Sequence, residues 1–348
     1  MSFVKLAVLS LQFIKIKREI EMNTNKSSGV VSIEHTGSPD VLKYQTTILK
    51  EAGEGEVLIA QKSIGVNFVD IFFRNGTFPM EAYPAPIGSE AAGVIEAVGP
   101  GVKDFVVGDR VAYPFSVGAY AESRIIPAAS LFKLPDDISF DQAAAVLVKG
   151  LTAHMLLKQS YGVKAGDIVL IHAMTGGVGT LLSAWARALG AIVIGTVGSA
   201  TKKELALKRG FEHVVDLQSQ DFAEVVNEVT QGKGLDAVYD GTGEATFQKS
   251  IELIKAGGSA ILYGWLSGMP IINAEEMEQR KIQYVNPALY KYLENREKIA
   301  LAVTGIFNLV REGILDVQKP TVYALADAAK AHADLESRKT TGSIILKP

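Results

Sequence analysis

The glycine-rich stretch HAMTGGVG at residues 172–179 constrains the fold more than any other part of this sequence. It follows an apolar run, DIVLI (167–171), and precedes a segment in which apolar side chains recur at helical spacing. A second apolar run, AIVIGTVG (191–198), comes next. This order predicts a strand that ends at about Ala173, a helix that begins near Gly179, and then a second, parallel strand.

The turn has the composition of a phosphate-binding turn at the start of a helix. The first backbone N–H groups of a helix lack partners within it and lie at the positive end of the helix dipole. A pyrophosphate satisfies both conditions where the backbone is bare, as at Gly176 and Gly177, while Gly179 lets the helix pack closely on the strand. We therefore expect these glycines and Val178 to bind a dinucleotide. Met174 holds the first glycine position of G-x-G-x-x-G, so an ordinary tight turn is the alternative.

The end of the second predicted strand favours NADP over NAD. An NAD site usually has an acid there that binds the ribose 2′-hydroxyl. Gly198 and Ser199 occupy this stretch, and Lys202 follows, where it would attract a 2′-phosphate. These three residues are therefore predicted to bind NADP(H). Asp216 and Asp221 would argue for NAD if they lay close to the same pocket.

The chain has two regions with different patterns. Up to about Ala145, short apolar runs alternate with glycine and proline, which predicts an all-β, barrel-like region. After about Lys149, strands alternate with helices, which predicts a parallel sheet with right-handed crossovers. We expect three parts: a disordered N-terminal extension at residues 1–25, a β-rich domain at 26–148 that 288–348 complete, and a dinucleotide-binding domain at 149–287.

Composition narrows the chemistry. The 348 residues include no cysteine and carry a formal net charge of -3. The absence of cysteine excludes disulfides, thiolate metal ligands and a thiol nucleophile. The five histidines lack metal-ligand spacing, so we expect no bound metal. The small net charge gives no indication of a nucleic-acid partner. The longest uncharged run near the N-terminus, Leu6 to Ile14, is too short to cross a bilayer.

Seven motifs resemble, in the same order, those of the quinone oxidoreductase, or zeta-crystallin-like, branch of the medium-chain dehydrogenase/reductase superfamily. The resemblance runs from about Val30 to the C-terminus. The motifs are GVNFVDIFFRNG (65–76), PIGSEAAGVIEAVGPGV (86–102), GDRVAY (108–113), AAAVLVKGLTAHMLL (143–157), HAMTGGVG (172–179), GTVGSATK (195–202) and LESRKTTGSIIL (335–346).

The resemblance implies an α/β Rossmann domain, with a doubly wound parallel sheet, plus a GroES-like β-barrel catalytic domain built from both ends of the chain. It also implies a homodimer formed through the Rossmann domain, and we expect a cytoplasmic protein. Zinc-dependent members use Cys, His and Cys as catalytic ligands, whereas Asn67, Ser89 and Lys149 stand at or near these positions here. Because none of the three is a suitable replacement ligand, we expect zinc-independent chemistry.

Asn67 is the candidate catalytic residue. The resemblance places it near the nicotinamide, where its amide would bond either the ribose or the acceptor carbonyl; a turn-forming role is the alternative. Asp70 and Arg74 follow at helical spacing, and a structural ion pair explains them as well as catalysis does. Phe72 and Phe78 are expected in the substrate pocket, with core packing as the alternative. Family members often have tyrosines at both, so this pocket is more apolar.

Further coenzyme contacts follow from the resemblance. Lys149 and Thr152 match a K-G-L-T stretch near the coenzyme, and the backbone of Tyr263 and Gly264 is expected to bond the nicotinamide carboxamide. Two more positions lie near the adenosine phosphate: Arg338, which matches a family arginine, and Leu217, where some relatives have a tyrosine.

Without a metal Lewis acid, an electron-poor acceptor is the easiest to reduce, and quinones and enones qualify. The predicted function is an NADPH-dependent quinone reductase, with zinc-independent hydride or electron transfer to a quinone. The alternative enzyme is an NADPH-dependent enone or alkenal double-bond reductase. The non-enzymatic alternative is an RNA-binding or crystallin-like protein, as some relatives are. Neither a nucleic acid nor a membrane is an expected partner.

Overall fold

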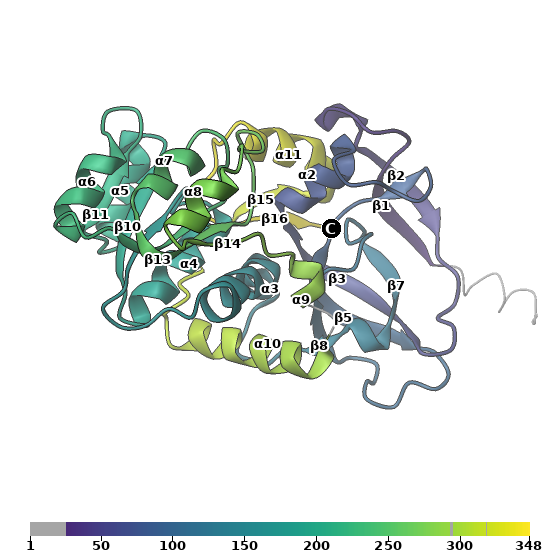
Figure 1. Cartoon of the computed structure of the whole chain (residues 1–348). Coiled ribbons are helices and arrows are strands. Elements are labelled where there is room, and N and C mark those ends of the chain that lie inside the picture. The colour runs from purple at the N-terminus through teal and green to yellow at the C-terminus, as the bar shows by residue number, and fades with distance from the viewer. Residues whose placement is uncertain (1–25, 293–294, 318) are drawn as a thin grey trace, which may run out of the picture. The chain divides into compact units, whose positions relative to one another are not determined.

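The computed structural model describes residues 26–292, 295–317 and 319–348 (Figure 1). The predicted N-terminal extension, residues 1–25, lies outside the described residues. The described chain forms two compact units. The first comprises the described residues up to Ala144 with Val322–Ala333 and Ile345–Pro348, and the second comprises Ala145–Thr321 and Asp334–Ile344.

The last part of the chain divides differently from the expected domains. Residues 288–348 were expected to complete the first domain, but residues 288–321 and 334–344 belong to the second unit. Packing explains the difference. Helix α10 (Arg296–Arg311) buries Ile306 against Gly150, where a Cβ atom would lie 3.0 Å from Ile306 Cγ2. Because Gly150 has no side chain, the isoleucine of α10 can approach the backbone of the second unit closely.

The second unit contains a six-stranded sheet in which all neighbouring strands are parallel. Its strands, in spatial order, are β11 (His213–Asp216), β10 (Ile192–Val197), β9 (Ile168–Ile171), β12 (Leu235–Asp240), β13 (Ile254–Leu262) and β14 (Gln283–Val285). The order reverses between β9 and β12, as in the doubly wound dinucleotide-binding fold. In such sheets ligands bind outside the carboxyl ends of the strands at this switch point.

Five helices connect these strands. They are α4 (Gly177–Ala188), α5 (Ala200–Lys208), α6 (Phe222–Thr230), α7 (Phe247–Glu252) and α8 (Ala274–Gln279). A buried cluster that includes Leu170, Ile194 and Val238 joins the sheet to Phe222 of α6 and Phe247 of α7. Strand β9 ends at Ile171 and is thus shorter than the strand predicted to end at about Ala173. Helix α4 begins at Gly177, two residues before the predicted start at Gly179.

The first unit consists of β-sheets and short helices. A seven-stranded sheet contains β15 (Thr321–Ala324), β16 (Ile344–Lys347), β3 (Glu56–Val66), β5 (Glu90–Val98), β6 (Arg110–Tyr113) and β8 (Phe132–Lys133), with β7 (Ser123–Pro127) paired to β3. A three-stranded sheet contains β2 (Lys43–Ile48), β1 (Ser27–Ile33) and β4 (Ala85–Pro86). The predicted barrel-like region is thus built from two sheets, which one bridge between Val30 and Ala121 connects.

Three helices carry residues of interest. Helix α2 (Phe68–Asn75) follows β3, and α11 (Ala328–Glu336) precedes β16. Helix α3 (Phe140–Met155) runs across the boundary at Ala144. Among the described residues, no helix combines the length and the apolar composition that crossing a lipid bilayer requires.

Candidate coenzyme-binding and catalytic sites

The turn between β9 and α4 presents unpaired backbone donors. Gly176 is the N-cap of α4, and its N–H donates to Ala173 O at 2.9 Å. Within the described residues, the amides of Gly177, Val178 and Gly179 donate no hydrogen bond. These three N–H groups lie in the first turn of α4, at the positive end of its dipole. The structure therefore has a turn at the predicted place, with backbone donors that suit an anion.

Close backbone approach requires Gly179, whereas Gly177 lies against a lysine side chain. A Cβ atom at Gly179 would lie 2.2 Å from Ala173 O, which no side chain can tolerate. A Cβ atom at Gly177 would lie 3.0 Å from Lys149 Cε, so the buried lysine lies directly beside the turn. Gly342 also reaches this place, where its N–H donates to Thr175 O at 2.9 Å. The turn, α3 and residues around 342 thus meet at the expected pyrophosphate position.

Met174 explains the departure from the glycine motif. Its side chain is buried, and a Cβ atom at Gly195 of β10 would lie 1.9 Å from its sulfur. The methionine thus fills the space that the missing side chain of Gly195 leaves. Ala173 adopts a left-handed conformation with φ of 53°, which is uncommon for a residue other than glycine. Such strained backbone is concentrated at functional sites.

Beyond β10, two cations lie next to each other. Ser199 caps α5 by accepting a bond from the Lys202 N–H, and Lys202 Nζ donates to Arg338 O at 2.8 Å. Burial and the nearby Arg338 lower the pKa of Lys202. A phosphate bound here would relieve this repulsion. Gly198 leaves the approach open, because a Cβ atom there would meet nothing within 4 Å.

The two acids that would have favoured NAD have other partners. Asp216 accepts a bond from Gln218 N at 3.1 Å, and Asp221 caps α6 and pairs with Lys249 at 2.6 Å. Leu217 N donates to Val197 O at 3.0 Å, and its side chain is 39% exposed. The structure therefore places Leu217 beside the end of β10.

The remaining second-unit residues lie on the other side of the switch point or on α3. Tyr263 directly follows β13, its N–H donates to Asp240 O at 2.9 Å, and its ring packs on Gly241. A Cβ atom at Gly264 would lie 2.9 Å from Gly241 O. The Thr152 hydroxyl donates to Val148 O within α3 at 2.8 Å, which leaves its oxygen lone pairs as acceptors.

In the first unit, Asn67 is held at the start of α2. Its side chain is buried, and Nδ2 donates to the buried carboxylate of Glu90 at 2.8 Å. Its backbone N–H donates to Asp70 Oδ2 at 2.8 Å. A Cβ atom at Gly65 would lie 2.3 Å from Glu90 Oε1, so a glycine there makes room for the carboxylate. The amide orientation of Asn67 is thereby fixed.

Asp70 lies at the centre of a buried polar network at the start of α2. Ser89 and Tyr120 donate to the two Asp70 oxygens. Because Arg74 can only donate, His332 Nδ1, at 3.3 Å, must accept, and His332 Nε2–H then donates to Tyr120 at 2.8 Å. Burial, and then the charge of Arg74, lower the pKa of His332 to about 3. The histidine is therefore neutral, and its tautomer is fixed.

Phe72 and Phe78 belong to a half-buried aromatic cluster. Their ring centroids lie 5.3 Å apart, and both contact a neighbour, Phe68 or Phe73, edge to face. The helix face that carries Asp70 and Arg74 is buried, whereas these rings keep part of their surface exposed. The cluster thus presents aromatic surface that lacks hydroxyl groups.

The positions of the zinc ligands in related enzymes are engaged in other bonds. Asn67 is bonded to Glu90, Ser89 to Asp70, and Lys149 lies beside Gly177. Within the part of the chain that the structure describes, no three His, Asp or Glu side chains group as a metal site. These donor sets do not fit zinc.

Fold and site together define a dinucleotide-dependent oxidoreductase of two units. Family models agree: residues 53–136 match the alcohol dehydrogenase GroES-like domain, and residues 177–303 match the zinc-binding dehydrogenase model. The chain is 42% identical to a 2-haloacrylate reductase of Burkholderia and 39% identical to quinone oxidoreductase 1 of Escherichia coli. These matches cover 91% and 90% of this chain, and 98% and 97% of the relatives.

Solved structures give the same result. The Escherichia coli quinone oxidoreductase complexed with NADPH superimposes with a TM-score of 0.88, at 37% identity, over 92% of this chain and all of that one. The structure of a 2-haloacrylate reductase superimposes with a TM-score of 0.78, at 41% identity, over 92% of this chain and 99% of that one. The chain belongs to the quinone oxidoreductase branch of the medium-chain dehydrogenase/reductase superfamily, which confirms the resemblance and the Rossmann plus GroES-like fold.

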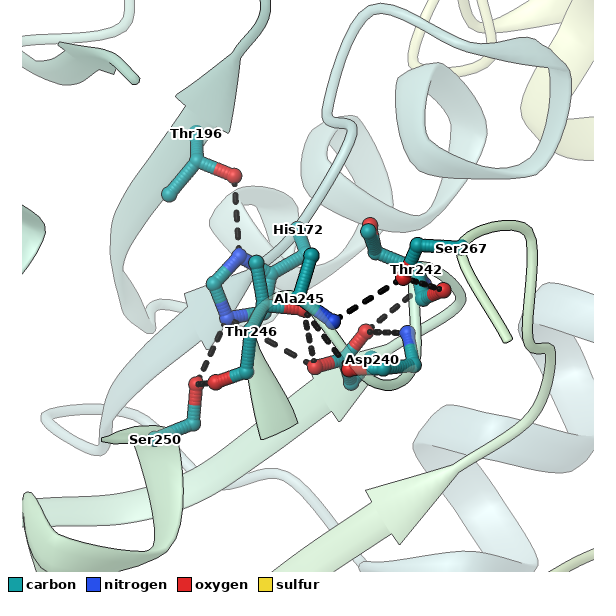
Figure 2. A network of polar contacts seen from close by, with 9 residues as sticks. His172, Thr196, Asp240, Thr242, Ala245, Thr246, Ser250 and Ser267 are labelled. Carbon is teal, nitrogen blue, oxygen red and sulfur yellow. Dashed lines mark hydrogen bonds and ion pairs between the residues drawn. The ribbon is translucent and has the colours of Figure 1, made fainter. Parts of the chain in front are cut away.

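Sequence reasoning missed the polar residues that support these sites. In the first unit these are Glu90, Tyr120 and His332. In the second unit they are His172, which directly follows β9, and Asp240, which is the last residue of β12 (Figure 2). Their place at the carboxyl ends of predicted strands is the one signal in the sequence that would have indicated the second pair.

Proposed function

We propose that this protein is an NADPH-dependent quinone reductase that works without zinc. The observation that carries the coenzyme assignment is the unpaired first turn of α4 together with the Lys202–Arg338 cation pair beyond β10. The turn suits a pyrophosphate and the cation pair suits a 2′-phosphate. The NADPH-bound quinone oxidoreductase that superimposes on this chain supports the same assignment.

In this proposal, the residues of the chain bind the coenzyme, orient the acceptor and polarise its oxygen. When bound, the coenzyme supplies the hydride equivalent. Gly177, Val178 and Gly179 would bind its pyrophosphate through their amides, and the backbone at Tyr263 would hold the carboxamide. Asn67, fixed by Glu90, would present its remaining polar atoms to the ribose or to the acceptor oxygen, where negative charge develops. The aromatic cluster with Phe72 and Phe78 would bind a flat, apolar acceptor.

An enone or alkenal reductase is the second candidate. The similarity to a 2-haloacrylate reductase favours double-bond reduction. That relative's substrate is an acid, whereas the α2 cluster here consists of uncharged rings. We therefore expect neutral quinones to be reduced fastest, neutral enones next, and 2-haloacrylates slowest.

The test is the oxidation of NADPH with a panel of quinones, enones and a 2-haloacrylate, repeated with NADH. Turnover of quinones, with preference for NADPH, supports the proposal. Turnover of enones alone replaces it with the second candidate. A protein that binds NADPH but reduces neither class would overturn both.

Lys202→Glu tests the coenzyme assignment. Losing one charge-assisted contact and adding repulsion should raise the KM for NADPH by about 30-fold, while the KM for NADH changes little. Lys208→Glu, at an exposed position of the same helix, is the matched control. Equal changes for the two coenzymes in Lys202→Glu would remove Lys202 from the phosphate site.

We also propose a homodimer formed through the second unit, and a cytoplasmic location, where NADPH is available. The strand order ends at β14, which leaves an edge strand with one partner among the described residues. Large apolar side chains near it in sequence are exposed, including Met269 at 55% and Ile271 at 89%. A second copy that covered them would remove both the open edge and the apolar surface. Light scattering of the wild type and of Ile271→Lys tests the dimer; a monomeric wild type would exclude it.

A further inference from the structure

A buried polar network lies directly under the carboxyl edge of the second-unit sheet (Figure 2). His172, the residue after β9, has no exposed surface. Its Nδ1 lies 2.9 Å from Thr196 Oγ1 of β10, and its Nε2 lies 2.8 Å from Ser250 Oγ of α7. Asp240, the last residue of β12, is equally buried, with Oδ2 3.8 Å from Nε2. The network thus links three strands and a helix at the switch point.

The donors and acceptors of this network have one consistent arrangement. The Ser250 hydroxyl donates to Thr246 O at 2.8 Å, so its oxygen must accept from His172 Nε2–H. His172 Nδ1 then accepts from the Thr196 hydroxyl. Burial lowers the pKa of His172, while Asp240 opposes the change. The histidine is therefore neutral and has a fixed tautomer, and both of its ring nitrogens are used in hydrogen bonds, to Thr196 and to Ser250.

Asp240 shapes the loop that follows β12. Its Oδ1 accepts from the N–H groups of Thr242 and Gly243, at 2.6 and 3.0 Å, and its Oδ2 accepts from the Thr246 hydroxyl at 2.7 Å. Thr242 O in turn accepts from both the N–H and the hydroxyl of Ser267, each at 2.8 Å. Direct hydrogen bonds therefore join the loops after β12 and β13, and the Asp240 carboxylate holds the part of this junction at Thr242 and Gly243.

These loops lie across the switch point from the cation pair. In the sheet, β12 and β13 lie on one side of β9, whereas β10, with Lys202 beyond its end, lies on the other. If Lys202 binds the adenosine phosphate, an extended dinucleotide brings its nicotinamide half to the β12–β13 side. Tyr263 and Gly264, whose backbone packs on Gly241, lie there.

We infer that His172 and Asp240 are positioning residues for the nicotinamide half of the coenzyme, an inference that rests on the proposed function. They touch no coenzyme atom themselves, since both are fully buried. They hold the 241–246 loop, and through Ser267 the 264–268 loop, in the form that receives the ring and its ribose. Their effect should therefore be confined to one half of the dinucleotide.

The test compares NADPH with adenosine 2′,5′-bisphosphate, which contains only the adenosine half, by titration calorimetry. His172→Leu should raise the Kd for NADPH by about tenfold and leave the Kd for the bisphosphate within about twofold. His172→Gln, whose amide N–H replaces Nε2–H, should restore most of the affinity. If His172→Leu does not fold, the near-isosteric Thr246→Val, which removes one donor to Asp240, takes its place.

His154→Gln, at a histidine bonded to Tyr292 in the same unit, is the control. Equal weakening of both ligands would show a merely structural role and overturn the inference, as would unchanged binding of both. Failure of the proposed function itself looks different, because the wild type would then bind no NADPH or reduce no acceptor.

Discussion

The two units build their candidate sites in opposite ways. The candidate site of the second unit consists mainly of main-chain groups of one short stretch, Ala173–Thr180, where the absence of side chains is the essential feature. The first unit relies on side chains from α2, β5, the segment before β7 and α11, which form a polar network around Asn67 and Asp70. The comparison teaches that adding a side-chain atom should damage the main-chain site of the second unit most. Removing a side-chain atom should instead damage the side-chain site of the first unit most.

The largest effect is expected from adding a side chain to the turn. Gly179→Val would place its Cβ 2.2 Å from Ala173 O, so the backbone must move and the first-turn amides lose their alignment. We expect NADPH affinity to fall by at least about 100-fold, together with a lower Tm. Gly305→Ala in α10, where a Cβ atom meets nothing within 4 Å, is the control and should be neutral or slightly stabilising. Wild-type affinity in Gly179→Val would break the comparison.

This contrast also explains how much the sequence could predict. The apolar runs at 167–171 and 191–198 and the glycine turn at 172–179 depend on local pattern, and the structure shows β9, β10 and the β9–α4 turn there. The domain assignment of residues 288–321 failed because the packing of Ile306 on Gly150 is a long-range contact. The network around Asp70 was not predicted for the same reason, since neither Tyr120, which bonds to Asp70, nor His332, which bonds to Tyr120, has a spacing relation to it.

The next effect comes from removing a side chain in the first unit. Asn67→Ala should lower kcat by about 100-fold, the scale of losing one donor to a developing charge, while stopped-flow titration shows NADPH still bound. Asn75→Ala, at the other end of α2, is the matched control. A rise in the Kd for NADPH with kcat retained would instead place the Asn67 amide on the ribose.

One fully buried histidine in each unit, His332 in the first and His172 in the second, allows the two units to be compared through the pH dependence of stability. His332 lies beside a cation and His172 beside an anion, although burial lowers the pKa of both. A histidine with a pKa near 3 when folded and the ordinary value of 6.5 when unfolded binds protons mainly in the unfolded state between these values. Its contribution to stability is therefore complete above about pH 6.5 and is lost progressively as pH falls towards 3.

Urea unfolding at about pH 7.5 and about pH 5 measures this contribution. The loss attributable to His332 at about pH 5 is about 2 kcal/mol, so His332→Gln should reduce the acid-induced drop in the free energy of unfolding by that amount. His172→Gln should reduce the drop less, because Asp240 favours protonation there. An equal reduction in both variants would contradict the assigned environments.

The smallest expected effect is a gain at the adenosine phosphate. Leu217 lies beside the end of β10 and is 39% exposed, so a larger side chain fits there without repacking the core. Leu217→Tyr adds a phenol that donates one hydrogen bond, which should lower the KM for NADPH by about threefold and leave that for NADH unchanged. Leu207→Tyr, also exposed but within α5, controls for added aromatic surface. An equal gain for both coenzymes would mean that the ring stacks on adenine instead, and that the 2′-phosphate lies elsewhere.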